Sequence, residues 1–128
     1  MPLNKSLMIT PAMKEAQAQA ALLDYVANKR WEKETGGIVL NGMALATDDR
    51  SKALITGARI AAENDPDFTT KWKTADGSFV TVNASMIIAI SDAMLEHVQE
   101  CFATEAQVLA DIENGLITTQ QEVDAAFA

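Results

Sequence analysis

One histidine and one cysteine stand about one helical turn apart and are the residues best suited to chemistry. His97 precedes Cys101 by four positions, and Glu96 and Glu100 lie beside them. A zinc site needs about four ligands, mostly Cys and His, and the chain has one of each. A Cys–His nucleophile pair needs an electropositive setting such as a helix N-terminus, whereas Cys101 falls in mid-helix on an apolar stripe. We therefore expect a helix-surface histidine and a core cysteine, with no catalytic, metal-binding or cofactor-binding residue.

Three other groups suggest chemistry but have structural explanations. Asp48-Asp49 and Asp65-Pro66-Asp67 lack the spacing of a calcium loop, and helix capping and turn formation account for them. Lys71-Trp72-Lys73 has the composition of a single-strand nucleic-acid site, but lysines also protect the edge of a sheet. Gly36-Gly37 lacks the Gly-Lys-Ser/Thr ending of a phosphate loop. The sequence contains no convincing catalytic constellation, so we expect no enzyme.

Charge is distributed unevenly along the chain. The formal net charge is −8, and every Lys and Arg lies at or before Lys73. The acidic second half would repel nucleic acids and anionic membranes. No apolar run approaches the roughly 20 residues of a membrane-spanning helix. A single cysteine suits a reducing cytoplasm. We expect a cytoplasmically made protein with neither a nucleic-acid nor a membrane partner.

Periodicity and capping signals predict where the first helix lies. Thr10 and Pro11 are typical of a helix start, and the pattern continues to about Glu34. Small and apolar residues recur on one side at helical spacing, which predicts close packing against another helix: Met13, Ala16, Ala20, Leu23, Ala27 and Trp31.

Turn signals predict two hairpins and a second helix. Asn41-Gly42 and Asp76-Gly77 each separate two short apolar runs, a strong hairpin signal. Between them, a helix is predicted to start at Thr47 and to stop before Asn64. Gly57 costs such a helix about 1 kcal/mol relative to Ala, which we attribute to close packing at that position.

The longest predicted helix starts at the cap Asn83 and runs to about Asn114. Two heptad series give it a wide apolar face: Ile88, Leu95, Phe102 and Leu109, and Ile87, Met94, Cys101 and Val108. This face either packs on the earlier elements or meets a partner in part. Glu105 favours the partner, because a buried unpaired carboxylate would cost several kcal/mol. Thr118 or Thr119 caps a short terminal helix through Glu122.

Together these elements predict an α+β fold. We expect residues 1–10 to form an extended arm and residues 11–128 to form a single α+β domain. Its two short β-hairpins, which can merge into one sheet, pack with three main helices. The longest helix lies near the C-terminus and precedes a short terminal helix.

The order of these motifs resembles an uncharacterised domain family of tailed bacteriophages and prophages, found in or near tail-fibre proteins. The resemblance covers about residues 28–127 and leaves out the arm and the first helix. It is carried by Lys29-Arg30-Trp31-Glu32, residues 36–42, 47–52 and 55–58, Trp72 to Gly77, and His97 to Phe102. The resemblance implies a phage tail or tail-fibre module and brings no catalytic residues with it.

From this context we expect a non-enzymatic phage tail protein, made in the host cytoplasm and located in the virion tail. It would bind a tail-fibre or tail-tip protein as connector, cap or accessory subunit, with homo-oligomerisation as a further option. The alternative is a tail-fibre assembly chaperone absent from the mature virion, which exposed methionines would favour. The candidate partner-binding residues are Leu3, Leu7, Met8, Ile9, Trp31 and Glu105.

Overall fold

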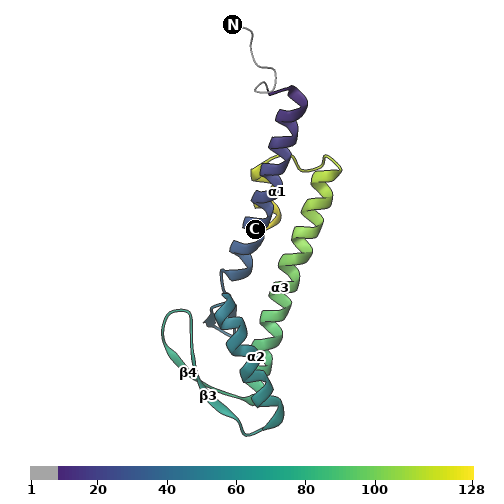
Figure 1. The fold of residues 1–128 in the computed structure, drawn as a ribbon. Coiled ribbons are helices and arrows are strands. Elements are labelled where there is room, and N and C mark those ends of the chain that lie inside the picture. The colour runs from purple at the N-terminus through teal and green to yellow at the C-terminus, as the bar shows by residue number, and fades with distance from the viewer. Residues whose placement is uncertain (1–8) are drawn as a thin grey trace.

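The computed structural model describes residues 9–128, so the predicted arm at residues 1–10 lies almost wholly outside the described residues. Within them the α+β prediction is confirmed, with four helices and two antiparallel hairpins (Figure 1). Along the chain the elements are α1 (Pro11–Thr35), β1 (Ile38–Leu40), β2 (Met43–Leu45), α2 (Asp49–Asn64), β3 (Thr69–Lys73), β4 (Phe79–Asn83), α3 (Ala84–Glu113) and α4 (Gln120–Ala126).

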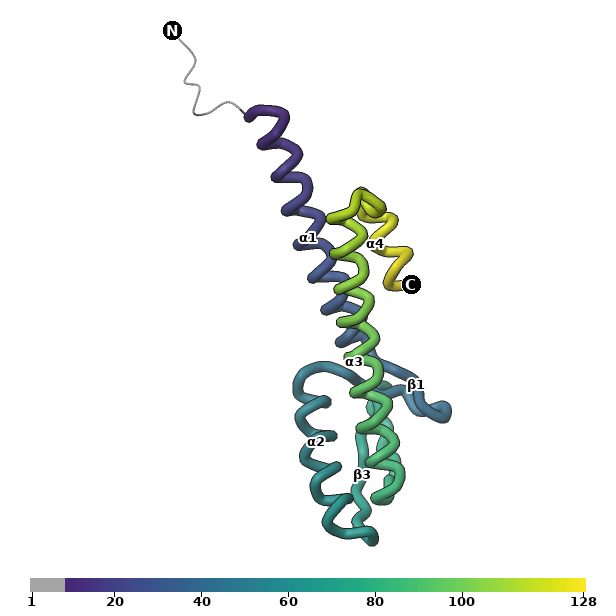
Figure 2. The backbone as a smooth tube through the Cα atoms, turned by 90° about the vertical axis from the view of Figure 1, so that its right-hand side faces the viewer, coloured from purple at the N-terminus to yellow at the C-terminus, as the bar shows by residue number. Residues whose placement is uncertain are grey.

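Helix α3 runs through the whole arrangement as its longest element. At 30 residues it spans about 45 Å. Figures 1 and 2 show α2 and the hairpins beside its N-terminal half, and α1 and α4 beside its C-terminal half. Helix α1 continues past the end of α3, and every residue from Pro11 to Ala21 is exposed.

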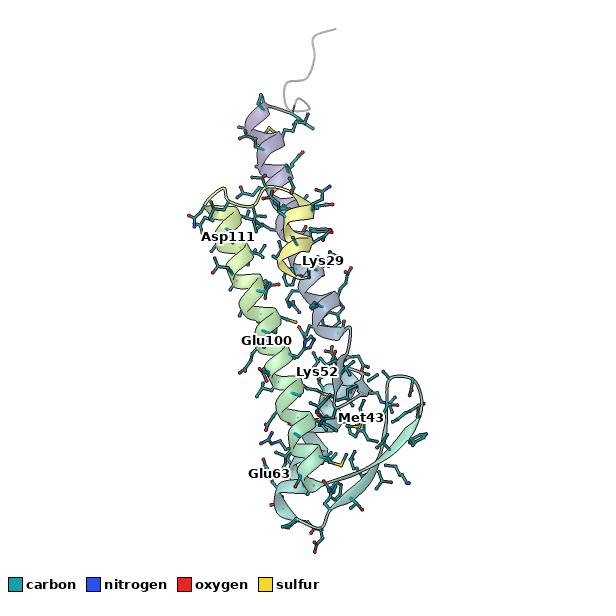
Figure 3. All side chains as sticks on the ribbon, turned by 180° about the vertical axis from the view of Figure 1, so that it is seen from behind. Lys29, Met43, Lys52, Glu63, Glu100 and Asp111 are labelled. Atoms are coloured by element: carbon teal, nitrogen blue, oxygen red, sulfur yellow. The ribbon has the colours of Figure 1, made fainter. Side chains whose placement is uncertain are left out.

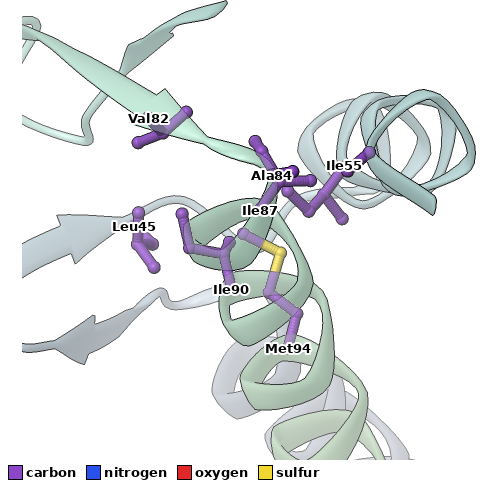
Figure 4. Close-up of a cluster of buried hydrophobic side chains, with 8 residues drawn as sticks. Leu45, Ile55, Val82, Ala84, Ile87, Ile90 and Met94 are labelled. Carbon is purple, nitrogen blue, oxygen red and sulfur yellow. The ribbon is translucent and has the colours of Figure 1, made fainter. Parts of the chain in front are cut away.

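Two separate hydrophobic clusters lie along α3. The hairpin-side cluster joins α2, α3 and the hairpins (Figure 4) and consists of Leu45, Ile55, Ala62, Val82, Ala84, Ile87, Ile90 and Met94. The C-terminal cluster joins α1, α3 and α4 and consists of Leu22, Val26, Val108, Ile112, Val123 and Phe127. Trp72 is half-buried and packs against the hairpin-side cluster.

The predicted caps and turns are mostly confirmed. Side-chain oxygens of Thr10, Asn83 and Thr119 accept backbone N–H bonds at the starts of α1, α3 and α4. Asn41 and Gly42 have φ values of 50° and 80°, which is the left-handed geometry that a two-residue hairpin turn requires.

The region between α1 and α2 differs from its prediction in one respect. Helix α2 begins at Asp49 with Asp48 as its N-cap, so Thr47 does not cap it. Instead, the buried Thr47 hydroxyl donates to the Glu34 carbonyl at 2.6 Å and accepts the Gly37 N–H at 2.8 Å. These two hydrogen bonds hold the end of the hairpin β1–β2 against the C-terminal end of α1. Because the Thr47 hydroxyl is used in these contacts, it does not cap α2.

The two hairpins remain separate sheets rather than merging into one. A single backbone bond, from the Ala75 N–H to the Ala44 carbonyl at 2.8 Å, links them. The explanation given for Gly57 is also wrong, because a Cβ there would meet no atom within 4 Å. That glycine faces open space and no neighbour requires it.

The apolar stripe predicted to pack α1 against another helix is exposed instead. Met13, Leu23 and Trp31 are 40–46% exposed, so the predicted packing of this stripe against another helix is wrong. Helix α1 buries a different face, which contains Leu22 and Val26. The larger Leu22 and Val26 side chains fill the space between α1, α3 and α4, which the small alanines of the predicted stripe could not fill.

Candidate protein-binding surfaces

Of the six candidate partner-binding residues, only Ile9, Trp31 and Glu105 are among the described residues. Leu3, Leu7 and Met8 lie outside the described residues. Ile9 is exposed just before α1. Trp31 and Glu105 lie in the region where α1 passes α3, although only Trp31 is exposed there.

Between the two hydrophobic clusters, charged side chains from three helices form a polar junction. Its centre is Glu34, whose side chain is only 6% exposed. Arg30 Nη1 lies 2.6 Å from Glu34 Oε1, and Lys52 pairs with the other oxygen of the same carboxylate. Burial alone would raise the pKa of Glu34, but the bonds donated by Lys52 and Arg30 hold that pKa below its usual value. The junction therefore keeps this buried carboxylate ionised.

Glu105 belongs to the same junction. Its Oε2 accepts a hydrogen bond from Arg30 Nε at 3.2 Å, and the pair is mostly buried. The Glu105 carboxylate therefore has an ion-pair partner inside the chain, and its position on α3 does not by itself indicate an interface. Figure 3 labels Lys52 where α1 ends and α2 begins, beside this junction.

Helix α4 covers one side of the α1–α3 pair. Asp124 accepts a hydrogen bond from the Tyr25 hydroxyl at 2.5 Å and lies 3.4 Å from Lys29 Nζ. These contacts place α4 on the side of α1 that carries Tyr25 and Lys29. Phe127 lies near His97 and Cys101 of α3 on the same side. The opposite side of the pair has no helix over it among the described residues.

That opposite side carries large apolar side chains from both helices. Leu95, Phe102 and Leu109 of α3 face it, together with α1 residues at a four-residue spacing from Leu23. We call this surface the apolar face and define it by Leu23 (40% exposed), Trp31 (46%), Leu95 (57%), Phe102 (48%) and Leu109 (37%).

Two cations of the polar junction lie close to the two aromatic rings of the apolar face. The Arg30 guanidinium lies 4.6 Å from the centroid of the Phe102 ring. Lys52 Nζ lies 6.0 Å from the centroid of the Trp31 ring. Both distances suit cation–π attraction, so these contacts limit how the two aromatic rings can turn.

At its α2 end, the apolar face continues into a groove of about 300 Å³ between α2 and α3. Leu95 forms part of the groove, and Ile55, Met94 and Val98 line it further. An apolar surface that ends in a groove can accept a protruding side chain from another protein.

His97 and Cys101 are placed for structural roles. His97 Nε2 lies 2.9 Å from the Lys33 carbonyl oxygen, in the last turn of α1. Cys101 is buried, as predicted, and burial raises the pKa of its thiol, which opposes the thiolate form that a nucleophile needs. Among residues 9–128, no three Cys, His, Asp or Glu side chains are gathered closely enough to hold a metal ion. None of the helices described is long and apolar enough to cross a membrane.

The sequence reasoning missed most of the apolar face because it assigned both heptad series of α3 to one surface. The series of Ile87, Met94, Cys101 and Val108 is buried, whereas Leu95, Phe102 and Leu109 are exposed. The available signal was the width of the pattern. A helix packed on one side has apolar residues at three or four positions in every two turns, so large apolar residues beyond that stripe indicate a second contact.

Comparison with known proteins identifies the chain at the family level. A family model described as a domain of unknown function (DUF4376) matches residues 17–127. The match includes most of α1, so the expectation that the first helix lies outside the family domain is wrong. No curated protein and no solved structure matches the chain.

Proposed function

We propose that this chain, which belongs to the DUF4376 family of domains of unknown function, is a non-enzymatic subunit that binds another protein through its apolar face. The phage context of the motif resemblance makes a tail-fibre or tail-tip protein the proposed partner. In that role the chain would act as connector, cap or accessory subunit in the virion tail.

The apolar face is the observation that supports this proposal. Five large apolar side chains share one side of two packed helices, while α4 covers the other side. Full burial of such a side chain from water is worth about 1.5–3 kcal/mol, and these five, at 37–57% exposure, still leave a large part of that stabilisation to a partner. Contiguous exposed apolar residues on a soluble surface commonly mark a protein contact. Trp31 is the strongest anchor on the face, because tryptophan is enriched among residues that dominate binding energy.

The assembly chaperone has less support from the described residues. Its expected signal was a surface rich in exposed methionine. Of the methionines described, Met13 is exposed, Met43 and Met86 are half-buried, and Met94 is fully buried. The aromatic and leucine side chains of the apolar face are less flexible than methionine, and they suit one defined partner better than several different ones.

Co-purification with the tail-fibre protein of the same phage tests the proposal. We expect the double variant Phe102→Ser/Leu109→Ser to lose at least about tenfold in affinity, because each change removes a partly exposed apolar side chain from the apolar face. Leu116→Ser is the matched control, since Leu116 is 69% exposed but lies beyond the C-terminal end of α3. Equal binding by both variants would contradict the proposal.

Mass spectrometry of purified particles separates the two roles. Stoichiometric peptides of this chain in the particle support the connector. Absence from the particle, with the chain abundant in the infected lysate and bound to the fibre protein, supports the chaperone. Light scattering of the purified chain tests homo-oligomerisation, which the Phe102→Ser/Leu109→Ser variant would abolish if the apolar face mediated it.

A further inference from the structure

A second groove lies between α2 and the hairpin β3–β4, and it shares no residue with the apolar face. It has a volume of about 750 Å³, and Figure 1 shows the hairpin bending away from α2 toward its tip. Apolar side chains from both elements line it: Leu54, Ala58, Phe68, Trp72 and Phe79. Leu54 and Phe79 are more than half exposed, so the groove is open to a ligand with apolar side chains.

Basic residues border this groove although the whole chain is acidic. Arg50, Lys71 and Lys73 lie along it, with Asp48 as its only carboxylate. Among the described residues none of these three bases forms an ion pair, whereas Lys29, Arg30, Lys52 and Arg59 all do. The groove therefore carries a local excess of positive charge that an acidic ligand would complement.

One wall of the groove is the free edge of β3. The Thr74 N–H donates a hydrogen bond to the Ser78 carbonyl at 2.8 Å. Along an antiparallel pair of strands, residue pairs that exchange backbone hydrogen bonds alternate with residue pairs that do not. Trp72 and Val80 therefore form a pair joined by backbone hydrogen bonds. The backbone N–H and C=O groups of Lys71 and Lys73 point away from β4. No backbone hydrogen bond to a described residue is formed on that side by either lysine.

On this same side of the chain, one backbone group just beyond β3 already forms a hydrogen bond. Ala75, two positions beyond Lys73, donates its N–H to the Ala44 carbonyl. The open groups at Lys71 and Lys73 continue the same side of the chain along the groove. A strand laid beside them would satisfy both their donors and their acceptors.

We propose that the groove between α2 and β3 binds an extended acidic segment of a partner protein, which adds to β3 as a third strand. The partner's backbone pairs with Lys71 and Lys73, its carboxylates face the three bases, and its apolar side chains contact Trp72 and Phe79. Strand addition explains why the edge is open, and the charges select an acidic sequence.

The occupant is a different protein rather than this chain or a nucleic acid. Residues 1–10 contain one lysine and no carboxylate, so they lack the required charge. Most carboxylates of the second half lie on α3 and α4, which are helical and cannot add as a strand. A nucleic acid has no peptide groups to pair with the strand edge, and the net charge of −8 repels it.

Nuclear magnetic resonance titration of the full-length chain tests this proposal and detects weak binding. The probe is a synthetic peptide in which Asp or Glu alternates with Val and Tyr. We expect it to shift the amide signals of Lys71 and Lys73 and the indole signal of Trp72. Binding should weaken as salt is added, because exposed charges are screened. A peptide with Lys in place of the acids, and a thymidine oligonucleotide, should leave these signals unchanged.

Two sets of variants separate charge from strand pairing. Lys71→Glu/Lys73→Glu should weaken binding by about tenfold. The control Lys14→Glu/Lys33→Glu reaches the same net charge on exposed residues of α1 and should bind like the original chain. Lys71→Pro removes an outward N–H without touching the bonds to β4 and should bind about fivefold more weakly than Lys71→Ala.

Three results would overturn the proposal. One is the absence of any shift with the acidic peptide up to about a millimolar, the weak end of specific binding. Another is equal weakening by both double lysine variants, which would show a general charge effect. The third is binding of the oligonucleotide or self-association at the groove instead. Thermal unfolding of each variant establishes that the fold is intact, and none of these tests depends on the apolar face.

Discussion

Arg30 Nη1 lies 2.6 Å from Oε1 of Glu34, a carboxylate with only 6% of its side chain exposed. The same guanidinium reaches Glu105 on α3 through Nε. One side chain of α1 therefore pairs with a buried acid on its own helix and with an acid on the neighbouring helix, between the two hydrophobic clusters.

Replacing Arg30 by Met should lower the free energy of unfolding by about 3 kcal/mol, because the mostly buried Glu105 loses its ion-pair partner and the buried Glu34 keeps only Lys52. Lys29→Met is the matched control. Lys29 pairs with Asp124, whose side chain is 45% exposed, and its loss should cost about 1 kcal/mol or less. Urea denaturation of both variants measures the difference, and equal losses would show that the polar junction contributes nothing beyond surface ion pairing.

Acid should destabilise the protein partly through Asp76. Hydrogen bonds from the Ser78 and Thr74 side chains lower the pKa of Asp76 from 3.8 to about 2. A carboxyl group with a depressed pKa in the folded state stabilises the fold above its unfolded pKa and loses this effect as pH falls. We expect the unfolding midpoint temperature to drop between about pH 4 and pH 2, and to drop less in Asp76→Asn. Parallel curves for both proteins would contradict this assignment.

Gly57→Ala should stabilise the protein by roughly 0.5–1 kcal/mol, since Gly is costly inside a helix and a Cβ at this position meets nothing within 4 Å. Gly36→Ala should do the opposite. A Cβ at Gly36 would lie 2.8 Å from the Glu32 carbonyl oxygen, closer than side chains are tolerated. Thermal unfolding of both variants checks the two opposite signs.

Neighbouring residues of α3 should respond differently to truncation. Val108 is fully buried in the C-terminal cluster, whereas Leu109 is 37% exposed on the apolar face. We expect Val108→Ala to lower the free energy of unfolding by about 2 kcal/mol. Leu109→Gln should change it by about 0.5 kcal/mol or less. Chemical denaturation measures both, and a larger loss for Leu109→Gln would place that side chain in the core.

Local signals in the sequence predicted the elements well because their chemistry is local. Asn41-Gly42 requires left-handed backbone geometry, and Asn83 supplies an oxygen to the start of a helix wherever the rest of the chain lies. These features predicted the order and bounds of most elements without knowledge of the tertiary structure.

Long-range contacts explain what the sequence did not predict. Thr47 is a good cap by type, but its hydroxyl is used by Glu34 and Gly37 from another part of the chain. Glu105 is unpaired along its own helix and finds Arg30 75 positions away. The stripe containing Leu23 and Trp31 is amphipathic by spacing, but spacing cannot tell which of two apolar faces the neighbouring helices cover.

The division of the interior into two clusters on one long helix has a consequence for the lifetime of the protein in the cell. Each cluster is small, and small cores leave little net stability. A partner that binds only the folded chain adds stability in proportion to the logarithm of its concentration. If the proposed partner binds in this way, copies made in excess of it would unfold more often and be degraded first, so the amount of this protein would follow the supply of that proposed partner.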